Sequence, residues 1–464
     1  MVFSSYTFLV LFFPLLLLCY YSVPRKHRRW RNTVLLLFSL VFYGCGGVRY
    51  LALMLVSILI NWGGGLLVSR GNGKRFWLVI ATALNLGLLG WFKYAGFFGG
   101  MLNSLWSAIP VPNVVLPIGI SFFTFQGLSY VIDVYRGEAE CQKDPLKVAL
   151  YVALFPQLVA GPIVRYPDVA AEIDADRETL SGFSEGLIRF CFGLAKKMLL
   201  ANPFGEIADG IFATDFSILS AASAWIGILG YALQIYFDFS AYSDMAIGLG
   251  RIFGFRFLEN FNYPYISRTV TEFWRRWHMS LSGWFRDYVY IPLGGSRRGV
   301  LRQVRNILIV WLLTGLWHGA AWNFVAWGAW YALLLLGEKF VWRKAAEKTP
   351  VPLKWLLTML AVLVGWVFFR STTLTSAVDY LKAMAGLGAS WGSGQAVYYL
   401  LEYWPEWVVG LLACLPIKPW LEKKIPEEQF IRVWGVRLLA GVLLIASFTK
   451  IITGTFNPFL YFRF

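Results

Sequence analysis

Two of the three histidines in this sequence stand among apolar and aromatic residues. His318 ends the apolar stretch 306–318 in the run GLWHGAAW, and Gly315 and Gly319 flank it. A buried imidazole without a partner costs about 1–3 kcal/mol, and ionisable groups inside membrane segments usually serve function. The glycines indicate room for a substrate. The pattern predicts a catalytic base for a substrate hydroxyl; the alternative is a core histidine bonded to a neighbouring helix.

The second of these histidines, His278, lies in the run FWRRWHMSLSGWFRD at 273–287. Read as one helix, this segment carries an apolar stripe of Trp274, Trp277, His278, Leu281 and Phe285. Such a pattern is typical of an amphipathic helix at the cytoplasmic membrane surface, with His278 on its inward face. His278 is therefore a second catalytic candidate, against the alternative of a histidine merely packed on the bundle. The third histidine, His27, belongs to a basic cluster and is expected to be solvated.

The segment 251–305 holds ten arginines and no lysine, which indicates that arginine in particular is needed there. A basic cytoplasmic loop would satisfy topology with either residue, whereas the guanidinium fork matches phosphate oxygens in two places at once. Arg275, Arg276 and Arg286 are therefore candidates to bind the phosphates of an acyl donor, either coenzyme A or the phosphopantetheine of an acyl carrier protein.

Other catalytic signatures are missing from the sequence. It contains no G-x-S-x-G elbow, no P-loop and no dinucleotide-binding glycine motif. The five cysteines are scattered without metal-ligand spacing. We therefore expect no metal and no tightly bound cofactor, and chemistry that depends on histidine.

The elements that must position these histidines are apolar segments. Of the residues, 58% are hydrophobic and only 15% are charged, against about 25% charged in soluble domains. A membrane-spanning helix needs about 20 apolar residues. Stretches near that length are 5–22, 33–46, 51–69, 76–92, 117–132, 147–160, 217–235, 306–318, 320–337, 353–369 and 433–449.

Several of these stretches are short or broken by Gly and Pro. Such segments are typical of re-entrant or bent helices that line a polar cavity, because exposed backbone cannot face lipid. The expected fold is an all-α, polytopic transmembrane helical bundle with a central tunnel and funnel. Since no linker or repeat is found, 1–464 is expected to form a single domain. A polysaccharide transporter or flippase, the non-enzymatic alternative, would predict internal repeats.

The net charge of +16 comes from Lys and Arg between the apolar stretches, which indicates membrane topology and not nucleic-acid binding. Five basic residues in 25–31 place 24–32 in the cytoplasm and the N-terminus outside, with the first stretch as a retained helix. Five more in 416–437 place that loop in the cytoplasm and the C-terminal tail outside.

Several runs resemble one known family. They are PIGISFFTFQ at 117–126, FPQLVAGPIVR at 155–165, QIYFDFS at 234–240, ENFNYPY at 259–265, FWRRWHMSLSGWFRDYVYIPLGG at 273–295, GLWHG at 315–319 and NPFLYF at 457–462. The likeness covers essentially the whole chain. The chain resembles the membrane-bound O-acyltransferases, in the bacterial branch typified by the alginate O-acetyltransferase subunit.

The resemblance implies a multi-pass enzyme of the bacterial cytoplasmic membrane. His318 would be the catalytic histidine at the bottom of an outward funnel, and His278 would lie by the cytoplasmic mouth of a tunnel for a thioester donor such as acetyl-coenzyme A. The acyl group, acetyl in the first instance, would go to a cell-surface or secreted polysaccharide with the help of an extracytoplasmic, esterase-like SGNH partner. D-alanyl transfer to teichoic acid, the activity of a cousin with the same two histidines, is the alternative.

Four further residues carry expectations. Asp238, Asn323 and Thr314 are candidates to orient the ring of His318, and the sequence does not choose among them. Tyr461, in the aromatic tail, is an acyl-relay candidate: the resemblance implies a tyrosyl ester that carries the acyl group outward. Because a phenol has a pKa near 10, its ester is more reactive than a sugar ester. The alternative is a tail that only anchors at the membrane interface.

Overall fold

The structure, a computed structural model, describes residues 1–392, 394–426, 430–454 and 456–458, and all regular structure in these ranges is helical. Within these ranges, six helices are long and apolar enough to cross a membrane. They are α3 (Val48–Ser69), α4 (Lys74–Leu105), α14 (Val300–His318), α15 with the turn that follows it (Trp322–Val341), α17 (Val351–Arg370) and the Val433–Thr453 part of α22. The predicted all-α, multi-pass membrane protein is confirmed, because helices satisfy every backbone group within lipid.

Other apolar stretches form shorter or bent helices. The stretch 147–160 divides into α6 (Pro145–Ala153) and α7 (Phe155–Leu158), because Leu154 leaves the helical conformation two residues before Pro156. The stretch 217–235 belongs to the longer helix α11 (Ala221–Ile252), which ends where Gly254 adopts a left-handed backbone. Broken helices were expected here; the predicted tunnel and funnel stay predictions.

The chain divides into two compact units, residues 1–190 with 242–258 and residues 191–241 with 259–464. A single domain therefore stays a prediction. The first unit also contains α1 (Phe13–Ser22), α2 (Arg28–Gly44), α5 (Ile120–Arg136) and α8 (Tyr166–Asp174), and α9 (Leu180–Ala195) begins in it. The second contains α10 (Asn202–Phe212), α12 (Val270–Arg276), α13 (Met279–Phe285), α16 (Arg343–Lys348), α18 (Leu374–Met384), α19 (Gly394–Glu402), α20 (Trp404–Ala413), α21 (Ile417–Lys424) and α22 (Phe430–Thr453).

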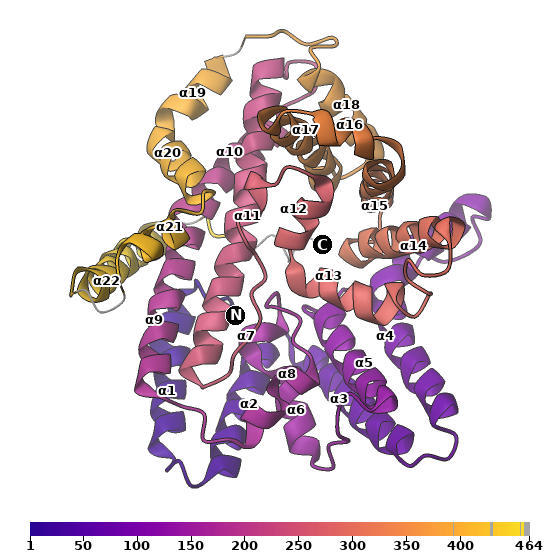
Figure 1. The fold of residues 1–464 in the computed structure, drawn as a ribbon, viewed down its shortest axis with the longest axis vertical. Helices are drawn as coiled ribbons and strands as arrows, with labels where there is room; N and C mark the ends of the chain where they lie inside the picture. The colour runs from indigo at the N-terminus through magenta and orange to yellow at the C-terminus, as the bar shows by residue number, and fades with distance from the viewer. Residues whose placement is uncertain (393, 427–429, 455, 459–464) are drawn as a thin grey trace. The chain divides into compact units, whose positions relative to one another are not determined.

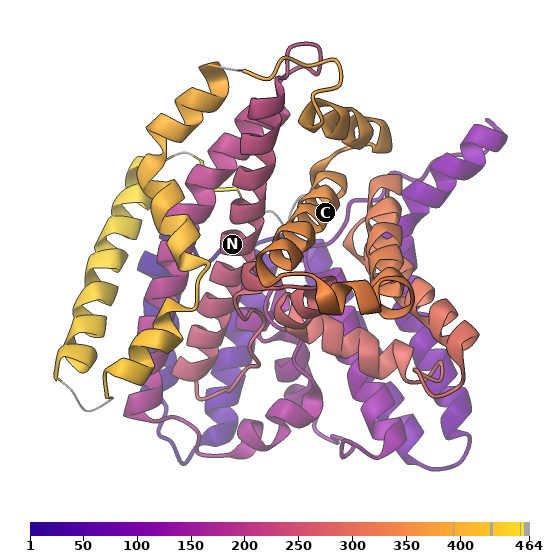
Figure 2. The same cartoon turned by 45° about the horizontal axis from the view of Figure 1, so that its top comes forward.

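The second unit holds both candidate histidines: His318 ends α14, and His278 lies between α12 and α13. α14 packs along α15, which packs on α17, and the short helix α12 contacts both α15 and α17 (Figure 1). Gly315 and Gly328 face each other across α14 and α15, where an added Cβ on Gly328 would lie 2.4 Å from the carbonyl oxygen of Trp311. Small residues allow this close approach of membrane helices. Among the C-terminal helices (Figure 2), α20 packs on α10 through the rings of Trp407 and Phe204, and α22 contacts the turn Lys196–Ala201 that precedes α10.

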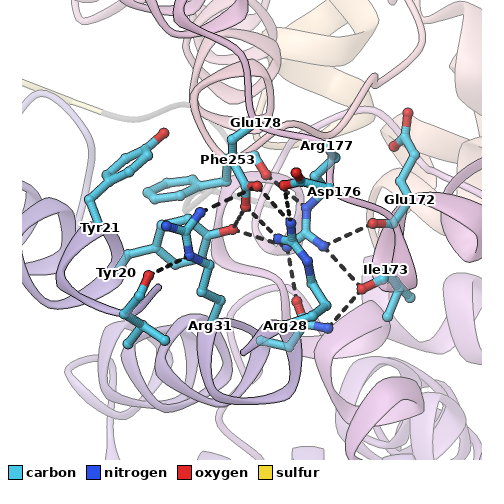
Figure 3. A network of polar contacts seen from close by, with 12 residues as sticks. Tyr20, Tyr21, Arg28, Arg31, Glu172, Ile173, Asp176, Arg177, Glu178 and Phe253 are labelled. Atoms are coloured by element: carbon cyan, nitrogen blue, oxygen red, sulfur yellow. Dashed lines mark hydrogen bonds and ion pairs between the residues drawn. The ribbon is translucent and has the colours of Figure 1, made fainter. Parts of the chain in front are cut away.

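A polar cluster in the first unit fixes α1 and α2 to the segment between α8 and α9 (Figure 3). Glu178 accepts a hydrogen bond of 2.7 Å from Arg28 Nη2 and another from the Tyr20 hydroxyl, and Arg31 Nη1 lies 3.4 Å from Glu178 Oε2. Arg177 donates to the Tyr20 hydroxyl at 3.2 Å. Burial alone would raise the pKa of Glu178, but the hydrogen bonds from Arg28 and Tyr20 and the charge of Arg177 lower it to about 2.

We expect Glu178→Gln to destabilise the protein, because it leaves the buried guanidinium groups of Arg28 and Arg31 without their carboxylate. Breaking such a pair costs about 3–5 kcal/mol. The depressed pKa of Glu178 means that its stabilisation is complete above its ordinary value of 4.5 and is lost as the pH falls toward about 2.

Thermal melting in detergent checks this prediction. At neutral pH the Glu178→Gln variant should melt well below the wild type, and the two curves should converge as the pH falls from 4.5 toward 2. Glu185→Gln is the matched control, since the Glu185 side chain is 55% exposed in its pair with Arg251 and such pairs contribute little. Equal melting of Glu178→Gln and wild type at neutral pH would contradict the role of the cluster.

Candidate active site

The segment around His278 is not one helix, so that prediction is wrong. α12 ends at Arg276 and α13 begins at Met279. Between them His278 has φ +45° and ψ +53°, in the left-handed region that residues other than glycine rarely adopt. The backbone N–H of Met279 donates to the carbonyl oxygen of Asn260 at 3.0 Å. A tertiary hydrogen bond thus replaces a helical one at the break.

The surroundings of His278 are nevertheless apolar, as the stripe predicted. Its side chain is 1% exposed, and the Phe239 ring stands edge-on to the imidazole with 4.6 Å between centroids. Nδ1 lies 3.1 Å from Asn260 Oδ1, a buried contact that the sequence reasoning missed. Burial lowers the pKa of His278 to about 3, so the ring is neutral.

His318 is the last residue of α14, as expected, and is 7% exposed. Its imidazole makes edge-to-face contacts with Trp327 of α15 and Phe369 of α17, each with 5.0 Å between centroids. The flanking glycines do not leave open space, so that interpretation is wrong. An added Cβ on Gly319 would lie 2.2 Å from the Phe324 ring, and one on Gly315 would lie 2.3 Å from the Phe324 carbonyl oxygen. These glycines make room for α15.

The structure brings the two histidines together through one indole. The Trp317 ring lies 4.9 Å from the His318 ring and 6.1 Å from the His278 ring, centroid to centroid. The aromatic cluster continues outward from Trp327 and Phe369, the two rings that contact His318. The further buried rings in it are those of Trp274, Tyr331, Trp366 and Trp277. An imidazole buried among aromatic rings can exchange a proton with a bound substrate, because such surroundings disfavour water.

The three residues expected to orient His318 form an ion pair or hydrogen bonds with other groups. Asp238 Oδ1 lies 2.6 Å from Lys197 Nζ in an ion pair whose side chains are 3% and 4% exposed. Thr314 Oγ1 donates to the Val310 carbonyl at 2.7 Å. Asn323 Nδ2 donates to the Ser371 carbonyl at 2.8 Å, which fixes the end of α17 just beyond the ring that packs on His318. Their roles toward His318 stay predictions.

Lys197 is a second residue that the sequence reasoning missed; a lysine inside the apolar run FCFGLAKKMLLA was the available signal. Its ammonium also donates to the Pro458 carbonyl oxygen, and Asn202 Nδ2 donates to the Phe456 carbonyl at 3.2 Å. The beginning of the C-terminal tail therefore lies on the buried Lys197–Asp238 pair. Tyr461 lies outside the described residues.

The three candidate phosphate ligands differ in their surroundings. Arg275 is exposed. Arg276 is bonded within its own turn, with Nε 3.0 Å from Glu272 Oε1. Arg286 Nε lies 2.6 Å from Asp287 Oδ1. Arg275 and Arg286 are both exposed, but Arg276 and Arg286 would have to exchange a carboxylate for a phosphate.

The chain matches a known protein family and several named proteins. The model of the membrane-bound O-acyltransferase family matches residues 142–378, about half of the chain. The chain is 40% identical to the probable alginate O-acetylase of Azotobacter vinelandii over the full length of both. It is 36% identical to the peptidoglycan O-acetyltransferase of Helicobacter pylori, over 83% of this chain and 80% of the other.

A more distant relative is named for a different activity. The teichoic acid D-alanyltransferase of Bacillus subtilis is 28% identical over 56% of this chain and 68% of its own. The O-acetyltransferases are therefore more similar over more of the chain, and the D-alanyl and transporter alternatives are not favoured. With its apolar helices, its buried histidine pair and these relatives, the chain belongs to the membrane-bound O-acyltransferase family and is a multi-pass membrane O-acyltransferase.

Proposed function

We propose that this protein moves an acetyl group from a cytoplasmic thioester to a hydroxyl outside the membrane, for O-acetylation of a cell-surface or secreted polysaccharide, with His318 as the catalytic base. The observation that carries the proposal is the buried His318 imidazole, joined to His278 by Trp317. Relatives named for acetylation of alginate and peptidoglycan support the reaction and the class of acceptor.

The chemistry follows from a neutral imidazole. His318 takes the proton of the acceptor hydroxyl while its oxygen attacks the thioester carbonyl carbon. The carbon–sulfur bond then breaks, and the imidazolium returns the proton to the departing thiolate. The acyl group passes from the donor sulfur to the acceptor oxygen, and the proton passes from the acceptor hydroxyl to the thiolate. This exchange requires no metal or redox group. The surrounding aromatic side chains exclude water, which would otherwise hydrolyse the thioester.

Purified protein in detergent, supplied with acetyl-coenzyme A and a polysaccharide acceptor, tests this function. Release of coenzyme A should depend on the acceptor and on His318. Acetylated carrier protein is the second donor to compare. An extracytoplasmic SGNH acyltransferase is the proposed partner for the last transfer, with Tyr461 as the relay between the two proteins. If neither thioester is consumed with acceptor and partner present, the proposed reaction is wrong.

On the donor side we expect paired Arg275→Ala and Arg276→Ala to raise KM for the thioester with a smaller change in kcat. Arg275 is exposed, and its replacement by alanine would remove a guanidinium contact to a donor phosphate. Steady-state kinetics against donor and against acceptor check this prediction. Arg343→Ala is the matched control, because that side chain is 77% exposed in a pair within α16. A change confined to acceptor KM would contradict the assignment.

The same proposal places the arginine-rich loop in the cytoplasm. Single cysteines at 26 and 297 in a cysteine-free background should resist an impermeant thiol reagent in intact cells, and both positions are exposed. Position 26 is chosen within the basic cluster at 25–31 because a cysteine at the nearby position 28 would remove the hydrogen bond between Arg28 and Glu178. Ser107→Cys, just beyond α4, is exposed and should be labelled from outside. Labelling at 26 or 297 but not at 107 would show that the predicted orientation in the membrane is reversed.

A further inference from the structure

The hydrogen bonds around Asn260 fix which nitrogen of His278 carries a proton. Asn260 Oδ1 lies 3.2 Å from the backbone N–H of Ser280, 2.9 Å from Ser280 Oγ and 3.1 Å from His278 Nδ1. A backbone N–H can only donate, so the amide atom that faces it is the oxygen. An amide oxygen can only accept, so Nδ1 of His278 carries the proton.

The other ring nitrogen is then left with a bare lone pair. His278 is neutral, because a second proton would place a charge on a group that is 1% exposed. Among the residues that the structure describes, none hydrogen-bonds to Nε2. A buried polar atom with no partner in the protein is expected to meet one in a ligand.

The backbone at His278 is arranged to hold this orientation. Its left-handed conformation is unfavourable for a residue other than glycine and persists only where neighbouring structure enforces it. Two backbone hydrogen bonds do so: Met279 N–H to the Asn260 carbonyl at 3.0 Å and Asn262 N–H to the Arg276 carbonyl at 2.9 Å. Asn260 therefore holds both the main chain and the ring of His278.

The ligand group at Nε2 must be a hydrogen-bond donor. A thioester offers only a carbonyl oxygen and a sulfur, both acceptors, and a bare nitrogen repels them. The pantetheine arm, however, has an amide N–H separated by two methylene groups from the sulfur. Since the Trp317 ring lies beside both imidazoles, an amide bound at His278 would place the neighbouring thioester near His318, the base for the acceptor hydroxyl.

We propose that Asn260 is a positioning residue that locks His278 in its Nδ1–H tautomer, so that Nε2 accepts a hydrogen bond from the pantetheine amide beside the thioester. This rests on the proposed thioester donor. His278 then aligns the donor and takes no part in proton transfer, which is left to His318. The tautomer also excludes His278 as a hydrogen-bond donor to the oxyanion of the intermediate.

Nitrogen NMR of protein labelled at histidine tests the first half, and it needs no activity. With three histidines in the chain, His27→Ala and His318→Gln assign the spectrum. His278 should show a protonated Nδ1 and an unprotonated Nε2. Asn260→Asp retains an acceptor and should keep this signature, Asn260→Leu should lose it, and Ser282→Ala, on the same helix, should not affect it. A protonated Nε2 in the wild type overturns the proposal.

Kinetics with a modified donor test the second half. Replacing the pantetheine amide nearest the sulfur by an ester removes one N–H and should raise KM about tenfold in the wild type, the loss expected for one buried hydrogen bond. His278→Asn keeps a donor to Asn260 and tolerates the left-handed backbone, but has no atom at Nε2. In it the amide and ester donors should be used equally. In His278→Gln, whose side-chain oxygen can replace Nε2 as acceptor, part of the preference should return.

The two proposals fail in different ways. If the wild type consumes no acyl thioester, the proposed function is wrong, and the ligand assigned to Nε2 is wrong with it, while the NMR result still decides the tautomer. If the wild type is active but its preference for the amide donor is the same in His278→Asn, the function stands and the hydrogen bond to Nε2 is wrong.

Discussion

Replacing His318 should abolish polymer acylation and leave the fold in place. Loss of a general base typically lowers a rate by 10²–10⁴-fold, so acylation by His318→Ala should fall below detection in most assays. The imidazole packs on Trp327 and Phe369, and its truncation leaves a small cavity. His318→Gln fills more of that space and should melt nearer to the wild type while remaining inactive.

Expression, detergent melting and acyl transfer measured on the same preparations check this prediction. His27→Ala is the matched control, because His27 is exposed at the start of α2 and should be dispensable. Acylation at the wild-type level by either His318 variant would refute the central proposal. Aggregated protein from both variants would instead assign His318 to packing.

Tyr461→Phe should also abolish polymer acylation, with normal expression, if the tail carries the acyl group as a tyrosyl ester. The substitution keeps the ring and removes only the hydroxyl that would form the ester. A phenyl ester is more reactive than a sugar ester because the phenol is the more acidic alcohol, so onward transfer to the polymer is downhill. Peptide mass spectrometry of wild-type protein should find the acyl group on Tyr461.

The described part of the tail offers a separate variant for the same prediction. Lys197 and Asn202 hold the carbonyl groups of Pro458 and Phe456, three and five residues before Tyr461 in the chain. Asn202→Leu removes one of these hydrogen bonds and should lower acylation of Tyr461 severalfold without eliminating it. Full activity of Tyr461→Phe would contradict the relay and leave the tail as a membrane anchor, whether or not Asn202→Leu lowers acylation.

Part of this protein follows from its sequence alone. Apolar runs near the length of a bilayer can only be helices there, because lipid offers no partner to backbone groups. The break at Leu154 follows from Pro156, and the position of His318 at a helix end follows from the run that precedes it. The family and its reaction were evident from contiguous motifs, since chemistry that depends on a few residues leaves a local signature.

Tertiary structure decided what those residues contact. The helix break at His278 depends on Asn260, 18 residues earlier, whose backbone and side chain replace local hydrogen bonds; helical periodicity cannot reveal a distant competitor. The sequence predicted open space beside Gly315 and Gly319, but Phe324 occupies that space. The charge of Asp238 is balanced by Lys197, 41 residues away in the chain. In each case the deciding partner comes from another segment, and only the folded chain brings the two within contact distance.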